Sequence, residues 1–159
     1  MHEKDKIPLE KLEVYTINYT TDFMDGVPIL KGRNYSHLDE VQYPKEIIDG
    51  VDGKQRWDFI LVDGPLGHVH GRFQSIYLAY RLAKKTLHLD AVERKDYNSV
   101  VHIFVHDAER WIERYFSDVY PNSTAEGLMR YYQFNHTWLT TIEENERNGF
   151  AFPFCKEWK

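Results

Sequence analysis

The stretch W-D-F-I-L-V-D-G-P-L-G, residues 57–67, decides the fold. The run from Trp57 to Val62 is almost continuously apolar, and a strand buried on both faces of a parallel sheet has this composition. Asp63-Gly64-Pro65 then ends the run with residues that favour turns. We therefore predict a buried strand at 57–62 that leads into a loop at 65–71.

The segments that follow continue the pattern. A stripe of apolar residues at helical spacing covers 72–88, and a second apolar run, V-V-H-I-F-V, covers 100–105. We predict a helix at 72–88, a buried strand at 100–105, an amphipathic helix at 108–119 and a further strand at 129–134. Strands that alternate with helices are typical of an α/β sheet with helices on both faces.

The remaining segments carry weaker patterns. Residues 12–20 alternate and contain β-formers, which favours a strand. Gly149 and Pro153 favour an irregular end to the tail at 138–159. The chain is predicted to be one domain over 1–159, with a loose N-terminal segment at 1–11, a loop at 21–42, a short helix or turn at 43–50 that opens with Pro44, and a polar connection at 90–98.

Composition narrows the class of protein. The 159 residues suffice for one domain with a core, and 42% apolar against 28% charged residues is ordinary for a globular protein. A net charge of -5 without a basic patch argues against a nucleic-acid partner. The apolar runs have strand length, so no transmembrane segment is predicted, and the charged N-terminus does not resemble a signal peptide. The single cysteine excludes an intrachain disulfide.

Candidate site residues follow the two best strands. Asp63 comes directly after 57–62, and His106-Asp107 comes directly after 100–105. Ligands of open α/β sheets bind at the carboxyl ends of the strands, and neighbouring strands lie about 4.8 Å apart. We therefore expect these three side chains to converge. They could hold a divalent cation through Asp63 and Asp107, or deprotonate a sugar hydroxyl through His106.

Each candidate also has a purely structural interpretation. Asp63 could simply form a turn, Asp107 could cap a helix that begins at Ala108, and His106 could be a half-buried histidine without chemistry.

Three further residues are candidates for substrate binding. His68 and His70 form an H-x-H pair that could bind a metal or a substrate, although no third ligand is evident nearby and two histidines exposed to solvent are the favoured interpretation. Arg72, at the start of the predicted helix, could pair with a carboxylate of an acidic substrate, or lie in solvent. The signatures G-x-x-x-x-G-K, H-E-x-x-H, G-x-S-x-G and G-x-G-x-x-G are absent from the sequence.

Three segments in order resemble one family. They are W-D-F-I-L-V-D-G-P-L-G (57–67), G-R-F-Q-S-I-Y-L-A-Y-R-L-A-K-K (71–85) and V-H-I-F-V-H-D-A-E-R-W-I-E-R-Y-F-S-D-V-Y (101–120). They resemble the polysaccharide-biosynthesis domain of glucuronoxylan 4-O-methyltransferases and the related irregular-xylem proteins. Phe73 replaces the methionine of the family pattern, and Arg110 is shifted by about one place.

The resemblance implies a Rossmann-like class I methyltransferase sheet. It also implies transfer of a methyl group from S-adenosylmethionine to a sugar hydroxyl, O-4 of glucuronic acid on xylan in the best-known members, in the Golgi lumen. By position, Asp63 and His106-Asp107 match the motif residues of the family. In small-molecule O-methyltransferases of similar topology, acidic residues at such positions bind a divalent metal.

The main departure from the family concerns the methyl donor. The glycine-rich turn and the acidic strand end that hold S-adenosylmethionine in the family have no counterpart upstream of 12–20. The sheet is therefore expected to be incomplete on its N-terminal side, and no Golgi anchor is seen. Two alternatives stay open: a non-catalytic accessory or glycan-binding module of polysaccharide synthesis, and a metal-dependent hydrolase that uses Asp63, His106 and Asp107.

Overall fold

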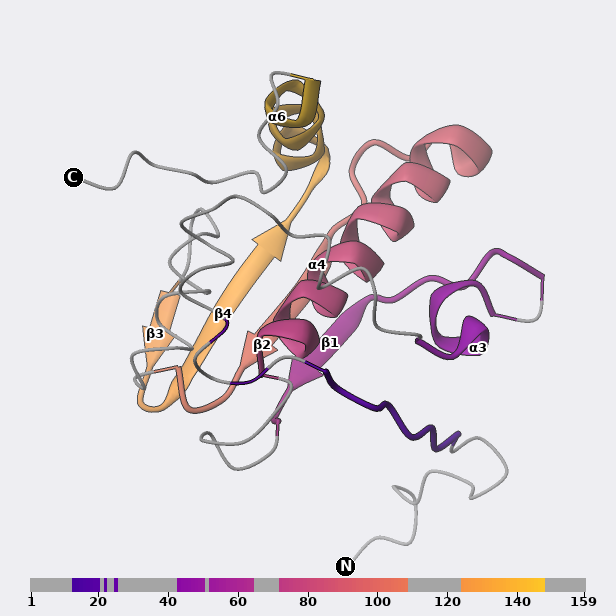
Figure 1. Cartoon of the computed structure of the whole chain (residues 1–159). Coiled ribbons are helices and arrows are strands. Elements are labelled where there is room, and N and C mark those ends of the chain that lie inside the picture. Colours follow the sequence, from indigo (N-terminus) through magenta and orange to yellow (C-terminus); the bar gives the residue numbers. More distant parts are fainter. Residues whose placement is uncertain are drawn as a thin grey trace, which may run out of the picture.

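The computed structural model describes residues 13–20, 22, 25, 43–50, 52–64, 72–108 and 124–147. Figure 1 shows α4 lying across one face of a small sheet. The elements in chain order are α3 (Lys45–Ile48), β1 (Phe59–Val62), α4 (Arg72–Leu89), the π-helical turn η4 (Asp90–Arg94), β2 (Val101–Val105), β3 (Thr124–Glu126), β4 (Met129–Phe134) and α6 (His136–Arg147).

The sheet has the strand order β1-β2-β4-β3. β1 and β2 are parallel neighbours, with Ile60 opposite Ile103 and Val62 opposite Val105, while β4 runs antiparallel to both β2 and β3. Parallel neighbours need a crossover connection, and α4 lies in that connection. The predicted strand–helix–strand unit is therefore confirmed, and a Rossmann-like methyltransferase sheet stays a prediction.

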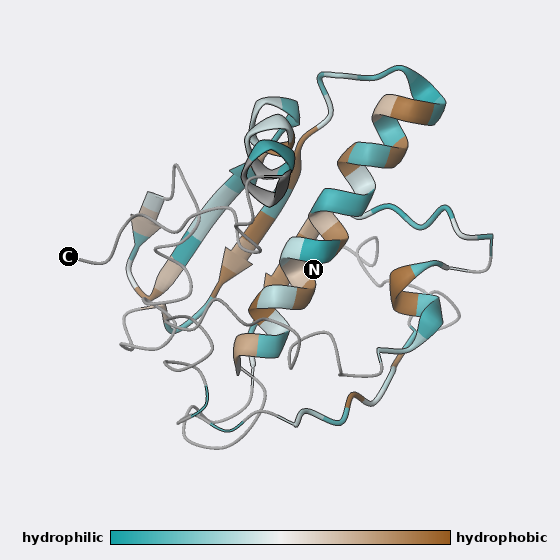
Figure 2. Cartoon of the chain, turned by 45° about the horizontal axis from the view of Figure 1, so that its top comes forward, coloured by the Kyte–Doolittle hydropathy of each residue, from teal (hydrophilic) through white to brown (hydrophobic). Residues whose placement is uncertain are grey.

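The core lies between the sheet and α4. In β2 the side chains alternate, so that Val101, Ile103 and Val105 are buried against the helix. Figure 2 shows hydrophobic residues recurring along both α4 and the strands beneath it. All six residues of the apolar stripe predicted for the helix are buried: Phe73, Ile76, Tyr77, Tyr80, Ala83 and Leu87.

β1 is buried on one face only, which corrects the prediction of a strand buried on both. Phe59 and Leu61 are 67% and 62% exposed. The register places them beside His102 and Phe104, on the face turned away from α4. No described element covers that face, so a continuous apolar run did not mean two-sided burial here.

Residues 13–20 form no strand, so that prediction is wrong for the described part of 12–20. Side chains hold the segment against α4 instead. The Thr20 N–H donates to Oε1 of Gln74 at 3.0 Å, Nε2 of Gln74 donates to Oγ1 of Thr20 at 3.0 Å, and the Ser75 hydroxyl donates to the Tyr19 hydroxyl at 2.9 Å. These bonds replace the backbone ladder that a strand would need.

α6 occupies the first part of the tail, for which no helix was predicted, while the irregular end expected around Gly149 and Pro153 lies outside the described residues. The helix begins at His136, directly after Asn135, whose side-chain oxygen accepts a hydrogen bond from the Trp138 N–H at 3.1 Å. That is an N-cap, and the tail prediction overlooked it. Trp138 and Leu139 are buried in the core. The short strand β3 and the π-helical turn were also missed.

The short helix predicted at 43–50 is confirmed as α3. Pro44 precedes the helix, and Gly50 follows it with a φ of 66°, a left-handed conformation that suits glycine at a helix end.

Of the loop at 21–42 only residues 22 and 25 are described. The segments 1–11, 65–71, 109–123 and 148–159 lie outside the described residues. No helix in the described ranges is long and apolar enough to span a membrane.

A set of ion pairs joins the segment before β1 to the turn after α4. Nε of Arg56 lies 2.8 Å from Oδ1 of Asp90, and Nη2 of Arg56 lies 2.8 Å from Oε2 of Glu93. The buried carboxylate of Asp90 also has Nη1 of Arg94 at 3.4 Å. This set fixes the end of the crossover relative to the start of the sheet.

Replacing Arg56 with alanine is expected to lower the free energy of unfolding by roughly 3 kcal/mol, because the buried Asp90 carboxylate would lose its closest cation. Urea unfolding followed by circular dichroism measures the loss. Lys54→Ala is the control, since Nζ of Lys54 lies 3.6 Å from Glu93 and is exposed, so its loss should be much smaller. Equal effects of the two variants would contradict the role given to Asp90.

Acid is expected to destabilise the fold through two carboxyl groups. The hydrogen bond from Lys85 lowers the pKa of Asp49, and the hydrogen bond from Arg56 lowers the pKa of Glu93. A carboxyl whose pKa is lower in the folded state stabilises the fold above its ordinary pKa, and this contribution is lost as the pH falls through the folded pKa. The melting temperature should therefore fall as the pH drops below the ordinary carboxyl range. The fall should be smaller in Arg56→Ala, and an identical fall would contradict the Glu93 contribution.

Candidate functional site

The carboxyl ends of β1 and β2 bring Asp63 and His106 side by side. The His106 N–H donates to the carbonyl of Val62 at 3.0 Å, which extends the parallel pairing by one residue beyond β2. Nδ1 of His106 then lies 3.2 Å from Oδ1 of Asp63 and 3.5 Å from Oδ1 of Asp107. The structure thus brings together the three residues that the strand-end argument selected, and their chemical roles stay a prediction.

The two carboxylates favour one tautomer of His106. A proton on Nδ1 faces both carboxylates, so the neutral imidazole carries its basic lone pair on Nε2. The side chains of His106, Asp63 and Asp107 are 35%, 61% and 21% exposed, so a solute can approach the group. The arrangement can therefore accept a proton from a bound hydroxyl group.

Asp107 adopts an unusual backbone conformation. Its φ is 55°, in the left-handed region that non-glycine residues seldom occupy. The turn at 106–108 is anchored on the turn between β3 and β4, because the Ala108 N–H donates to the carbonyl of Leu128 at 3.1 Å. Strained residues of this kind cluster at functional sites. The predicted helix start at Ala108 is not seen, because Ala108 lies in this turn.

The strain at Asp107 can be isolated by comparing two variants that both remove its carboxylate. The free energy of unfolding of Asp107→Gly is expected to lie within about 1 kcal/mol of the parent value, because glycine accepts a positive φ. Asp107→Ala should be less stable than Asp107→Gly by about 1 kcal/mol, since the Cβ atom disfavours this conformation. Urea unfolding of the two proteins tests the difference. If the alanine variant is as stable as the glycine variant, the turn is not strained.

The metal prediction has no direct support in the described residues. No group of three or more histidine, cysteine, aspartate or glutamate side chains in the described ranges is placed to hold a metal ion. The predicted ligands Asp63 and Asp107 both face Nδ1 of His106. His68 and His70 lie outside the described residues. Arg72 is the first residue of α4, and its side chain also lies outside the described part.

A second candidate site lies on the open face of the sheet. The ring of His102 stacks on Phe59, with centroids 5.0 Å apart, and on Tyr131 at 5.7 Å. Nδ1 of His102 also lies 2.6 Å from the Tyr131 hydroxyl. A cavity of about 510 Å³ opens beside these rings, which is a size typical of ligand pockets. Its lining residues are His102, Phe104, Thr124, Glu126, Met129 and Tyr131.

The sequence of this chain was compared with those of known proteins. No family model matches the chain, and no solved structure matches it. The chain is similar to Protein IRX15-LIKE of Arabidopsis thaliana, with 42% identity over 127 residues, which cover 68% of this chain and 36% of the relative. The chain therefore spans about a third of that relative's length. This similarity supports the relation to the irregular-xylem proteins that the three motifs predict.

Proposed function

We propose that this chain is a xylan-biosynthesis protein of the irregular-xylem family and carries the acceptor-activating residues of a sugar O-methyltransferase. The observation that carries the proposal is the 3.2 Å contact between His106 and Asp63 at the carboxyl ends of two parallel strands. The similarity to Protein IRX15-LIKE supports the xylan context. The acceptor proposed from the motif resemblance is O-4 of glucuronic acid on xylan, and the proposed compartment is the Golgi lumen.

His106 is the general base in this proposal. A sugar hydroxyl is a poor nucleophile at neutral pH, and loss of its proton to Nε2 of His106 as the new bond forms lowers the barrier. Asp63 holds the Nδ1–H tautomer and stabilises the imidazolium that results. Asp107 adds a second carboxylate to the same nitrogen. The remaining contribution is alignment of the acceptor oxygen.

The described residues do not form a recognisable cradle for S-adenosylmethionine. The strand ends offer Asp63, His106 and Asp107, which are acid–base groups, and the described ranges contain no glycine-rich turn beside them. The roles of these three residues therefore concern the acceptor hydroxyl alone. A divalent metal at Asp63 and Asp107 likewise adds no step.

The test measures methyl transfer by the full-length gene product. Labelled S-adenosylmethionine is supplied with glucuronoxylan or with xylan that lacks glucuronic acid. The proposal expects label on the first polymer and little on the second. Label on neither polymer, from a folded protein that binds both, would overturn the proposed activity. Titration calorimetry of S-adenosylmethionine into the 159-residue chain reports separately whether this chain binds the donor.

The aromatic cavity on the sheet face favours one second candidate, a non-catalytic glycan-binding module. Aromatic side chains next to polar groups such as Thr124 and Glu126 suit a sugar, which has both apolar faces and hydroxyl groups. This function needs no methyl donor. It expects Tyr131→Ala to abolish xylan binding, and it expects no methyl transfer that His106→Ala could lower.

A further inference from the structure

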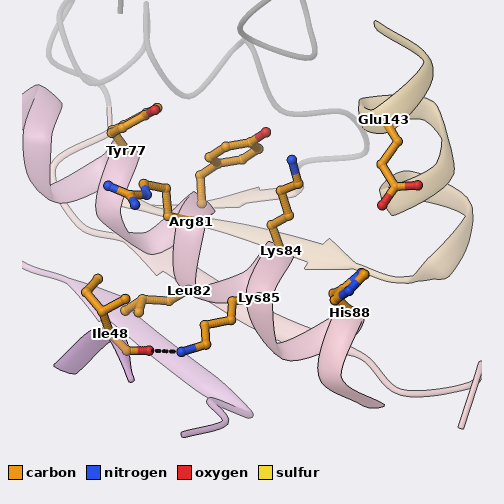
Figure 3. A pocket seen from close by; sticks show the side chains of 9 residues that line it. Ile48, Tyr77, Arg81, Leu82, Lys84, Lys85, His88 and Glu143 are labelled. Atoms are coloured by element: carbon orange, nitrogen blue, oxygen red, sulfur yellow. Dashed lines mark hydrogen bonds between the residues drawn. The ribbon is translucent and has the colours of Figure 1, made fainter. Parts of the chain in front are cut away.

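A groove runs along the outer face of α4, between α3 and α6. Figure 3 shows it with Ile48 on one side and Glu143 of α6 on the other. Its volume is about 460 Å³, within the usual range for small-molecule sites. Besides two tyrosines, the polar side chains that line it are Arg81, Lys84, Lys85, His88 and Glu143.

The charge of this groove differs from that of the whole chain. The chain has a net charge of -5, yet the 18 residues of α4 include no aspartate or glutamate. Arg81, Lys84 and His88 recur at intervals of three and four residues, which brings them onto one face of the helix. In the sequence Leu82 and Ala83 stand between Arg81 and Lys84, while Lys85 directly follows Lys84.

Three cations of this set, Arg81, Lys84 and Lys85, also have partners within the chain. Lys85 is held by α3, because Nζ of Lys85 lies 2.6 Å from Oδ1 of Asp49 and 2.7 Å from the carbonyl of Ile48. The helix dipole favours His88 in the last turn of α4. Lys85, and to a smaller extent Arg81, lowers the pKa of Asp49, so Arg81 also has an electrostatic partner in the chain. The single carboxylate in the lining is Glu143, which lies across the groove from Lys84 and His88 (Figure 3).

The groove is separate from the site at Asp63 and His106. The Trp57 N–H donates to Oγ1 of Thr86 at 3.1 Å, so the last turns of α4 lie beside the start of β1. Asp63 follows the other end of β1. The groove therefore lies toward the opposite end of the strands, and its role does not depend on the proposed methyl transfer.

We propose that this groove binds a small ligand through a phosphate or carboxylate group, with Arg81 and Lys84 as the binding cations. A guanidinium group matches the geometry of an oxyanion with two parallel hydrogen bonds, and the lysine adds a flexible point charge. Both side chains also contact other groups of the chain, so the anion binds in competition with those contacts. Glu143 weakens anion binding by repulsion.

Titration calorimetry of the chain with inorganic phosphate, and separately with galacturonate, tests the proposal and distinguishes a phosphate from a sugar carboxylate. At least one probe is expected to bind with a Kd in the millimolar range or tighter. The double variant Arg81→Gln/Lys84→Gln should weaken binding roughly tenfold or more, and Glu143→Gln should tighten it. Lys54→Ala, which removes an exposed cation outside the groove, is the matched control and should bind as the parent does.

Three results would overturn the proposal. The first is the absence of heat from either probe up to about 10 mM, a concentration that reveals even weak binding. The second is unchanged binding by a folded double variant. The third is an equal loss of binding in Lys54→Ala. The opposite effect expected for Glu143→Gln separates a site from a general loss of stability, because destabilised variants do not gain affinity.

Discussion

Replacing His106 with alanine is expected to lower methyl transfer by the full-length protein by about 100- to 10,000-fold, the usual contribution of a positioned acid–base group. Asp63→Asn should cause a smaller loss of the same kind, since the amide can still lie near Nδ1 but no longer stabilises the imidazolium. The measurement is the transfer of label from S-adenosylmethionine to glucuronoxylan under initial-rate conditions.

Two controls separate chemistry from folding in this experiment. Asp58→Asn changes an exposed aspartate five residues before Asp63, ahead of the start of β1, and should leave the rate unchanged. Added imidazole should restore part of the activity of His106→Ala, which a structural role would not predict. A rate within threefold of the parent in a folded His106→Ala protein would remove His106 from the mechanism.

Replacing Phe134 with alanine is expected to lower the free energy of unfolding by about 3–5 kcal/mol. Phe134 is 1% exposed, and its ring meets that of Trp138 edge-on with centroids 3.9 Å apart. Truncation leaves a cavity where β4 joins α6, because Phe134 is the last residue of the strand and Trp138 lies in the first turn of the helix. Urea unfolding measures the loss.

Leu61→Ala is the matched control for this core variant. Leu61 also lies on a strand, but it is 62% exposed, and surface substitutions usually change stability by less than about 0.5 kcal/mol. If Leu61→Ala costs as much as Phe134→Ala in this chain, the open face of the sheet is covered in solution and the burial described for β1 is wrong.

Local patterns in the sequence were sufficient for the elements that build the core. The helix at 72–88 carries a helical stripe and the strand at 100–105 an apolar run, and both lie where they were predicted, as does the strand at 129–134. Such patterns indicate which side chains of a segment can be buried, and in the structure these side chains are buried between α4 and the strands.

The errors share a cause, because a local pattern does not report what lies opposite a segment. Residues 57–62 read as buried on both faces, yet Phe59 is exposed since no described element packs on it. Residues 13–20 alternate like a strand, but Gln74 and Ser75 of α4 hold them by side-chain bonds. In the tail no helix was predicted at 136–147, although Asn135 caps α6.

The candidate site was predictable in position but not in detail. Two strand ends in register are enough to place Asp63 beside His106, because parallel strands end at the same edge. The left-handed backbone of Asp107 depends on the anchoring of Ala108 to Leu128, a contact between residues 20 positions apart in the chain. A contact of that range leaves no periodic signal in the sequence.

The one-sided burial of β1 affects how the purified protein must be handled. β1 stands at the end of the described sheet, so its outer backbone groups face no described strand, and Phe59 and Leu61 project beside them. An edge of this kind is a template on which a second copy of the chain can add its own strand. Self-association would then compete with ligand binding at the high protein concentrations that calorimetry uses. The titrations described above should therefore be repeated over a range of protein concentrations, with light scattering recorded on the same samples.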